Sequence, residues 1–247
     1  MSGSRILVVD DSRMFLQVLA EHLAREAAVE VVPATTLGAV RQILEEDTSF
    51  DAALLDLNLL DAPAGEVVDV VLERKIPVIV FAGDCTESTR QRLWAKPIVD
   101  YIVKEGEESL RYAVGLVRRV LRNRGTAVLV VDDSATVRHM LSEMLAVHCL
   151  TPMEAASGLE ALHVLAEHPE VRLMITDYDM PEMDGVRLVR VSRALYLKDR
   201  LAIIGISGHD QKDLSARFLK SGANDFLHKP FSAEELCTVG SPKIWTC

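Results

Sequence analysis

The 247-residue sequence predicts an α/β protein made of two tandem doubly wound domains, each with a parallel five-stranded sheet. Three observations predict this fold class. The chain repeats itself at an offset of about 122 residues, the size of a small domain and too long for a solenoid repeat. Within each copy, short β-branched apolar runs alternate with longer amphipathic stretches. Acidic residues follow the first and the third apolar run of both copies.

The internal repeat consists of three separated segments that return in the same order. The matching pairs are 6–13 with 128–135, 53–58 with 174–179, and 101–104 with 226–229. In each copy an Asp-Asp pair precedes a single aspartate, by 45 residues in the first copy and 44 in the second. Two copies of one fold account for this agreement.

The strands are predicted from the apolar runs. Near-continuous runs of this kind are typical of strands that are buried on both faces, as in a parallel sheet covered by helices. In the first copy the expected strands lie near 5–9, 29–32, 51–55, 77–81 and 99–103. In the second they lie near 127–131, 150–154, 172–176, 201–206 and 224–228.

The helices are predicted between the strands, where apolar residues recur at helical spacing. Three clear cases are 14–26, 107–122 and 136–146. Ser12 and Ser134 stand where N-caps are expected. Five βα units per copy predict the strand order 2-1-3-4-5.

The predicted domains span 4–123 and 126–237, and the second ends abnormally. Gly240 and Pro242 both oppose continuation of the fifth helix of the second copy. The last helix is therefore predicted to be truncated, and 238–247 to be an irregular or foreign tail.

Composition excludes several classes of protein. The net charge is −10, divided evenly between the copies, which argues against nucleic-acid binding. No apolar run reaches the length of a membrane span, and no signal-peptide pattern opens the chain. The four cysteines lie far apart, as is typical of free thiols in a reducing cytoplasm. We therefore expect a cytoplasmic protein without membrane or nucleic-acid contacts.

Carboxylates are predicted to converge at one edge of each sheet. Functional groups gather at the carboxyl ends of parallel strands, and strands 1 and 3 are neighbours in the predicted order. Clustered carboxylates repel one another unless a cation intervenes, and a hard divalent ion such as Mg²⁺ suits oxygen ligands. The acids that would meet are Asp10, Asp11 and Asp56 in the first copy, and Asp132, Asp133 and Asp177 in the second.

A lysine and a hydroxyl complete the predicted sites. Lys104 and Lys229 follow the fifth strands, and Ser207 ends the fourth strand of the second copy. A cation, an ammonium and a hydroxyl around an aspartate can stabilise a transferring phosphoryl group. The nucleophiles would be Asp56 and Asp177, each forming an acyl phosphate. A lone acid at a strand end is usually a loop or cap residue, but the same set occurs twice here.

At these residues the sequence resembles the receiver domains of bacterial two-component response regulators, which have a flavodoxin-like fold. The resemblance covers about 5–236 and rests in the second copy on 132–133, 177–185, 207–208 and 226–231. It implies that Asp177 accepts a phosphoryl group from a histidine kinase or a phosphotransfer protein. It also implies a regulatory role in a phosphorelay and no enzyme activity of the chain itself.

The resemblance assigns a role to each matching residue of the second copy. Asp133, Asp177 and the backbone carbonyl of Asp179 would bind Mg²⁺, or Mn²⁺ in its place, with Asp132 acting through water. Lys229 and Ser207 would hold the phosphoryl oxygens. Phe226 would be the aromatic switch that reorients when Ser207 moves towards the phosphate.

The first copy departs from the family pattern. It keeps Asp10, Asp11, Asp56 and Lys104, with Asn58 at the carbonyl position and Tyr101 at the aromatic position. Ala82 replaces the switch hydroxyl, and Glu105 replaces the proline whose bond is usually cis in the family. A non-proline cis bond costs about 3–4 kcal/mol, so either the loop is rearranged or it stores strain. We expect metal binding here with poor coupling of phosphorylation to shape.

The resemblance extends to partners, and two alternatives stay open. Tandem receivers in the family often precede an output domain such as a diguanylate cyclase (GGDEF), so an output domain or effector protein is expected, and dimerisation is compatible with this. The Asp177-Tyr178-Asp179 motif also fits a haloacid-dehalogenase-like phosphatase, although that family carries its motif after the first strand. The first copy could alternatively be an interaction module that works without phosphate.

Overall fold

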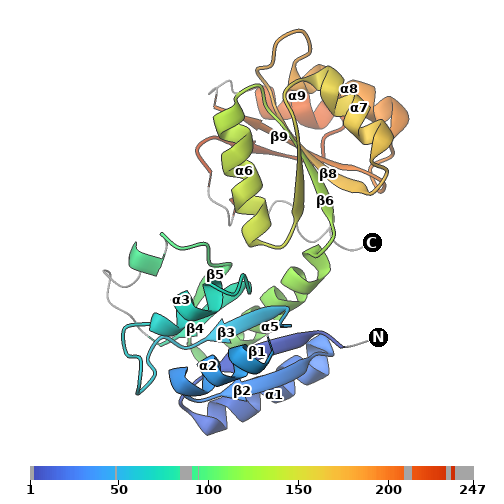
Figure 1. The fold of residues 1–247 in the computed structure, drawn as a ribbon. Coiled ribbons are helices and arrows are strands. Elements are labelled where there is room, and N and C mark those ends of the chain that lie inside the picture. The colour runs from blue at the N-terminus through green and yellow to red at the C-terminus, as the bar shows by residue number, and fades with distance from the viewer. Residues whose placement is uncertain are drawn as a thin grey trace. The chain divides into compact units, whose positions relative to one another are not determined.

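The computed structural model describes residues 3–47, 49–83, 91–93, 95–208, 213–231 and 235–236. The chain divides into two compact units, Met1–Asn123 and Arg124–Cys247 (Figure 1). The predicted tail at 238–247 lies outside the described residues. None of the helices in the described ranges combines the length and the hydropathy needed to cross a bilayer.

Unit 1 alternates strands and helices around a five-stranded sheet whose neighbouring strands are all parallel. Its strand order is β2-β1-β3-β4-β5, as the sequence predicts. The elements are β1 (Arg5–Val9), α1 (Arg13–Ala27), β2 (Glu30–Ala34), α2 (Leu37–Glu46), β3 (Ala52–Leu55), α3 (Glu66–Leu72), β4 (Val78–Ala82), β5 (Asp100–Val103) and α5 (Gly106–Asn123).

Unit 2 has the same topology, with the sheet order β7-β6-β8-β9-β10. The predicted order 2-1-3-4-5 is therefore confirmed in both units. The elements are β6 (Ala127–Val131), α6 (Ala135–Val147), β7 (Thr151–Ala155), α7 (Gly158–Glu167), β8 (Val171–Asp177), α8 (Gly185–Leu195), β9 (Ala202–Ser207), α9 (Leu214–Ser221) and β10 (Asp225–His228).

Helices cover both faces of each sheet, which explains why the central strands are mostly apolar (Figure 1). In unit 1, α1 packs on α5 and α2 packs on α3; in unit 2, α8 packs on both α7 and α9. Alternate residues of β6 belong to two different cores. Leu129 packs in the cluster with α7, α8 and α9, whereas Val128 packs in the cluster with α6. Every residue of β4 and β9 is buried.

The turns from β1 to α1 and from β6 to α6 fix the acidic pairs at the ends of the strands. The backbone N–H of Ser12 donates to Oδ1 of Asp10 at 2.9 Å, and that of Ser134 donates to Oδ1 of Asp132 at 2.9 Å. Both serines are N-caps in extended conformation, as expected from the sequence. Only the Ser12 hydroxyl accepts a helix N–H, that of Phe15 at 3.3 Å.

Candidate functional sites

The candidate site of unit 1 lies at the carboxyl edge of its sheet, where β1 and β3 end side by side. Val9 pairs with Leu55 at the last position of the β1–β3 ladder. The backbone N–H of Asp56 then donates to the carbonyl of Val9 at 2.8 Å. Asp10 and Asp56 are consequently neighbours, and both are buried.

Lys104 joins these two aspartates from the end of β5. Its ammonium donates to Oδ2 of Asp10 at 2.5 Å and to Oδ2 of Asp56 at 2.7 Å. The lysine side chain is 19% exposed, whereas the two carboxylates are 4% and 9% exposed. A buried pair of like charges is stable only with such compensation, so one ammonium serves two acids.

Unit 2 repeats the arrangement. The Lys229 ammonium donates to Oδ2 of Asp132 at 2.8 Å and to Oδ1 of Asp177 at 2.7 Å. Oδ2 of Asp177 accepts the backbone N–H of Asp179 at 2.7 Å. The corresponding bond in unit 1 runs from the N–H of Asn58 to Oδ1 of Asp56 at 3.2 Å. Each single aspartate is therefore held at one oxygen by lysine and at the other by its own loop.

The two units differ in how their acids are arranged for a cation. Asp10, Asp11 and Asp56 each bring a carboxylate oxygen within 4.8 Å of the others, so this trio could hold a metal ion. Within the described ranges, Asp132, Asp133 and Asp177 do not meet that spacing. The sequence predicts the same three acids in both copies, and the close grouping of their carboxylate oxygens is seen in unit 1.

Asp133 is the member of the second trio that its lysine does not hold. Its side chain is exposed, and Arg138 holds only its backbone carbonyl, at 3.2 Å, together with that of Asp132, at 2.7 Å. Asp11 in unit 1 is exposed as well, so exposure alone does not distinguish the two trios; the spacing of their carboxylate oxygens does. Asp132 and Asp177, by contrast, are fixed by their shared lysine.

Burial and the lysines have opposite effects on the protonation of these groups. Burial raises the pKa of Asp10 and Asp177, and the hydrogen bonds from Lys104 and Lys229 only partly offset it. For Lys229, burial lowers the pKa, but its hydrogen bonds to Asp132 and Asp177 outweigh burial and raise it. Lys229 therefore stays charged at neutral pH.

The predicted switch positions occupy equivalent places in the two units. Ala82 ends β4 and Ser207 ends β9, both fully buried, and their carbonyls accept the N–H groups of Lys104 and Lys229 at 2.8 Å. The Phe226 ring is half-buried, 5.3 Å from the ring of Phe218 between centroids. In unit 1 the Tyr101 hydroxyl donates to the carbonyl of Gly83 at 3.1 Å.

The loop after the lysine also differs between the units. The Lys229–Pro230 bond is cis, whereas the bond from Lys104 to Glu105 is trans. The N–H of Glu105 instead donates to Oγ of Ser109 at 3.0 Å and to the carbonyl of Val103 at 2.9 Å. Of the two alternatives that the sequence left open, the rearranged loop is the one observed.

Sequence reasoning missed two features around the sites. Phe15 and Phe81 surround the Lys104 ammonium, a contact that links α1, β4 and β5 and has no local pattern. Gly185, the first residue of α8, lies against the end of β8, since a Cβ there would be 2.1 Å from the carbonyl oxygen of Asp177. The only available signal was the glycine directly after the N-cap Asp184.

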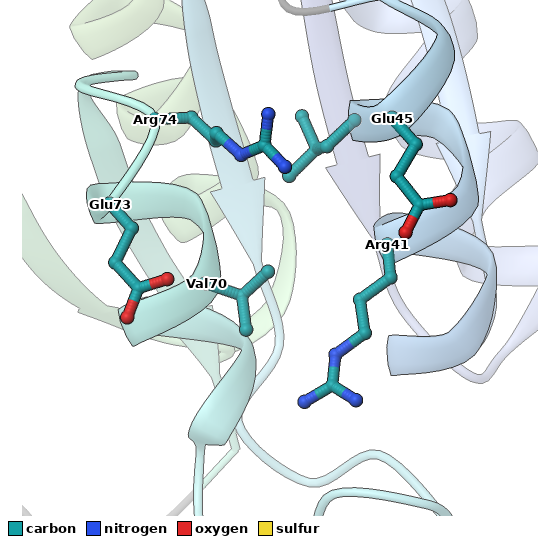
Figure 2. A pocket seen from close by; sticks show the side chains of 6 residues that line it. Arg41, Glu45, Val70, Glu73 and Arg74 are labelled. Carbon is teal, nitrogen blue, oxygen red and sulfur yellow. The ribbon is translucent and has the colours of Figure 1, made fainter.

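A separate cavity of about 300 Å³ lies between α2 and α3 (Figure 2). Helix C-termini border it, and these face the amino edge of a parallel sheet, opposite the acids. Charged side chains of both signs surround an apolar floor, so the cavity has no resemblance to the carboxylate–lysine sites. Its lining residues are Arg41, Leu44, Glu45, Val70, Glu73 and Arg74.

Comparisons with known proteins identify one family for both halves of the chain. The model of the response regulator receiver domain matches residues 6–114 and 128–239. A chemotaxis protein CheY homolog of Campylobacter jejuni is 36% identical over 110 residues, which are 44% of this chain and 85% of the relative. The sensor histidine kinase CheAY of Helicobacter pylori is 25% identical over 232 residues, 87% of this chain but 29% of that protein.

Solved structures include relatives of the whole chain. One is the crystal structure of a two-component system response regulator/GGDEF domain protein, with 44% identity, a TM-score of 0.88 and coverage of 95% of both chains. A second structure with a similar description has the same identity and TM-score over 96% of both chains. The chain therefore belongs to the response regulator receiver family of two-component systems and carries two CheY-like receiver domains in tandem.

Proposed function

We propose that this chain is a phosphorelay regulator that accepts phosphoryl groups on Asp177 and on Asp56, in receiver domains spanning 4–123 and 126–237. One observation carries the proposal: in each unit a single lysine bridges the candidate acceptor and a second buried aspartate. A structural ion pair would need only one carboxylate. With two carboxylates and one ammonium the site keeps a net negative charge, which suits it to a divalent cation.

The chemistry follows from the contacts of Asp177. A carboxylate oxygen attacks the phosphorus of a phosphohistidine on a histidine kinase or phosphotransfer protein. A P–O bond forms, the P–N bond breaks, and the imidazole nitrogen leaves with the electron pair and takes up a proton. The Lys229 ammonium is 2.7 Å from Asp177 Oδ1 and would donate a hydrogen bond to a phosphoryl oxygen, where it stabilises the negative charge.

The acidic residues fit Mg²⁺, with Mn²⁺ as an alternative hard cation. In unit 1 the ligands would be Asp10, Asp11 and Asp56 with the carbonyl of Asn58, and in unit 2 Asp132, Asp133 and Asp177 with the carbonyl of Asp179. A bound divalent cation supplies positive charge to the transferring phosphoryl group. The 4.8 Å grouping of the first trio supports this ligand set.

The two domains would use phosphorylation differently. Ser207 and Phe226 give the second domain a hydroxyl and an aromatic ring that can rearrange together. In the first domain Ala82 has no hydroxyl, and Tyr101 is bonded to the Gly83 carbonyl. We infer that the second domain signals, while the first couples phosphate weakly or acts as an interaction module.

The partner that reads this signal would be an output domain or effector protein. Two solved relatives, 44% identical over almost their whole length, are described as response regulator/GGDEF domain proteins. We infer that phosphorylation controls a diguanylate cyclase domain of the GGDEF type. The receiver chain itself would be regulatory and not an enzyme.

Phosphate mapping tests the acceptor assignment. The full chain is treated with acetyl phosphate and Mg²⁺, and hydroxylamine-sensitive phosphate is counted in the wild type, Asp56→Asn, Asp177→Asn and the double variant. We expect each single variant to lose the phosphate of its own domain and the double variant to lose all of it. Asp199→Asn, at an exposed loop position, is the matched control. Undiminished labelling of the double variant would contradict the proposal.

A further inference from the structure

An aromatic pair surrounds the lysine of the first site. The Lys104 ammonium lies 4.7 Å from the centroid of the Phe15 ring and 6.0 Å from that of the Phe81 ring. The two rings are 5.5 Å apart and tilted by 47°. A cation at these distances from aromatic rings is attracted by the negative electrostatic potential of their faces. Lys104 is thus held by two carboxylates and by two rings.

The same turn that positions Asp10 also positions Phe15. Oδ1 of Asp10 accepts the N–H of Ser12, whose hydroxyl accepts the N–H of Phe15 in the first turn of α1. Phe81 lies on β4, directly before Ala82, and is 2% exposed. The position of the Phe15 ring therefore depends on the backbone around Asp10 and not on a flexible loop.

Unit 2 is a natural comparison within the same chain. Val137 and Ile206 stand at the positions of Phe15 and Phe81, and both are aliphatic. Lys229 nevertheless reaches its two aspartates at 2.7 and 2.8 Å. The fold and the lysine–carboxylate contacts thus do not require the rings. The aromatic pair occurs in the unit that lacks the switch hydroxyl.

We propose that Phe15 is a positioning residue that holds the Lys104 ammonium for a phosphoryl oxygen on Asp56. The inference rests on the proposed phosphoacceptor role of Asp56. With alanine at position 82, Lys104 is the side chain that donates to Asp56 among the described residues of unit 1. Fixing the ammonium before the phosphoryl group arrives reduces the ordering needed on binding. Phe15 thereby compensates in part for the missing hydroxyl.

The test compares an aromatic with an aliphatic side chain at position 15. In full-length chains carrying Asp177→Asn, the affinity of the first site for beryllofluoride with Mg²⁺ is measured by 19F NMR. A cation–π contact of this kind predicts that Phe15→Leu weakens binding about fivefold and that Phe15→Tyr restores it to within about twofold. Met14→Leu is the control, since Met14 is on the same helix turn and 77% exposed.

A second measurement needs no phosphate mimic. In the wild type the ε-methylene protons of Lys104 should show an upfield ring-current shift in NMR spectra, lost in Phe15→Leu and kept in Phe15→Tyr. Equal beryllofluoride affinity of the Leu and Phe chains would overturn the role of Phe15 alone. Absence of binding with Phe15 in place would overturn the acceptor role of Asp56 as well, and with it this inference.

Discussion

At the scale of single residues, the burial of an acid at the candidate site acts against folding. Asp10 is buried beside Asp56, and burial raises its pKa above the ordinary value of 3.8. The folded chain therefore holds a proton on Asp10 more tightly than the unfolded chain does. Stability must fall as the pH rises from 3.8 through the raised pKa, and this loss persists at neutral pH.

The substitution Asp10→Asn tests this account of Asp10. Asparagine resembles the protonated acid, so we expect a higher midpoint of thermal unfolding than for the wild type at pH 7 with EDTA. With millimolar Mg²⁺ the order should reverse, because a ligand of the folded state stabilises only the chain that binds it. Asp199→Asn should leave both midpoints unchanged. Destabilisation by Asp10→Asn in EDTA would show that the bond to Lys104 outweighs burial.

At the scale of secondary-structure elements, the approach of α8 to β8 depends on one glycine. A Cβ at Gly185 would lie 2.1 Å from the carbonyl oxygen of Asp177 and 3.0 Å from the Phe218 ring. The N–H of Gly185 also donates to the carbonyl of Tyr178 at 3.0 Å. The start of α8 is therefore packed directly against the backbone of the candidate acceptor.

Gly185→Ala should move that backbone and destabilise the second domain. Overpacking of this kind costs about 1–3 kcal/mol, measurable by urea unfolding, and phosphate uptake on Asp177 should fall while uptake on Asp56 does not. Gly115→Ala is the control, because no atom lies within 4 Å of a Cβ built at that exposed position of α5. There alanine should stabilise by about 0.5–1 kcal/mol. Unchanged stability of Gly185→Ala would mean that α8 shifts freely.

The elements were predictable because their signals are local. Apolar runs mark β4 and β9 as buried on both faces. The strand order of a doubly wound sheet makes β1 and β3 neighbours, which brings Asp10 and Asp56 together. Contacts between distant segments have no such signal. Asp61, for example, accepts the N–H groups of Leu37 and Gly38 at 2.9 and 3.0 Å and so caps α2 from the loop after β3.

The limits of sequence reasoning are clearest in the candidate sites. The types and order of the charged residues predicted that each lysine lies near the carboxylates, because strand ends fix where those side chains begin, but they did not predict that one ammonium bridges two aspartates. Asp11 lies close to its two partner acids and Asp133 does not, and this difference could not be predicted, because both side chains are exposed and can adopt several rotamers. Phe15 was missed because its partner Lys104 lies 89 positions further along the chain.

At the scale of the whole molecule, the chain allows two versions of the candidate switch to be compared in the same fold. Its two receiver domains share a sheet order and a lysine bridge, but they differ at the end of the fourth strand, where unit 1 has Ala82 and unit 2 has Ser207. A hydrogen bond from a hydroxyl to a charged group contributes about 1.5–3 kcal/mol. That energy shifts a two-state equilibrium by roughly 10- to 150-fold, enough to change which state dominates.

Changing either of these two residues should therefore change the response of its own domain. With beryllofluoride and Mg²⁺, we expect aromatic NMR signals of Phe226 to move in the wild type and those of Tyr101 to stay almost unchanged. Ser207→Ala should suppress the response of Phe226 while mimic binding at Asp177 persists. In Ala82→Ser the hydrogen bond from the Tyr101 hydroxyl to the Gly83 carbonyl should still restrain the ring, so the signals of Tyr101 should move only slightly. In the double variant Ala82→Ser with Tyr101→Phe that bond is absent, and the signals of the ring at position 101 should move further. A full response of Tyr101 in the wild type would contradict weak coupling in the first domain, because it would show that the switch works without a hydroxyl at position 82.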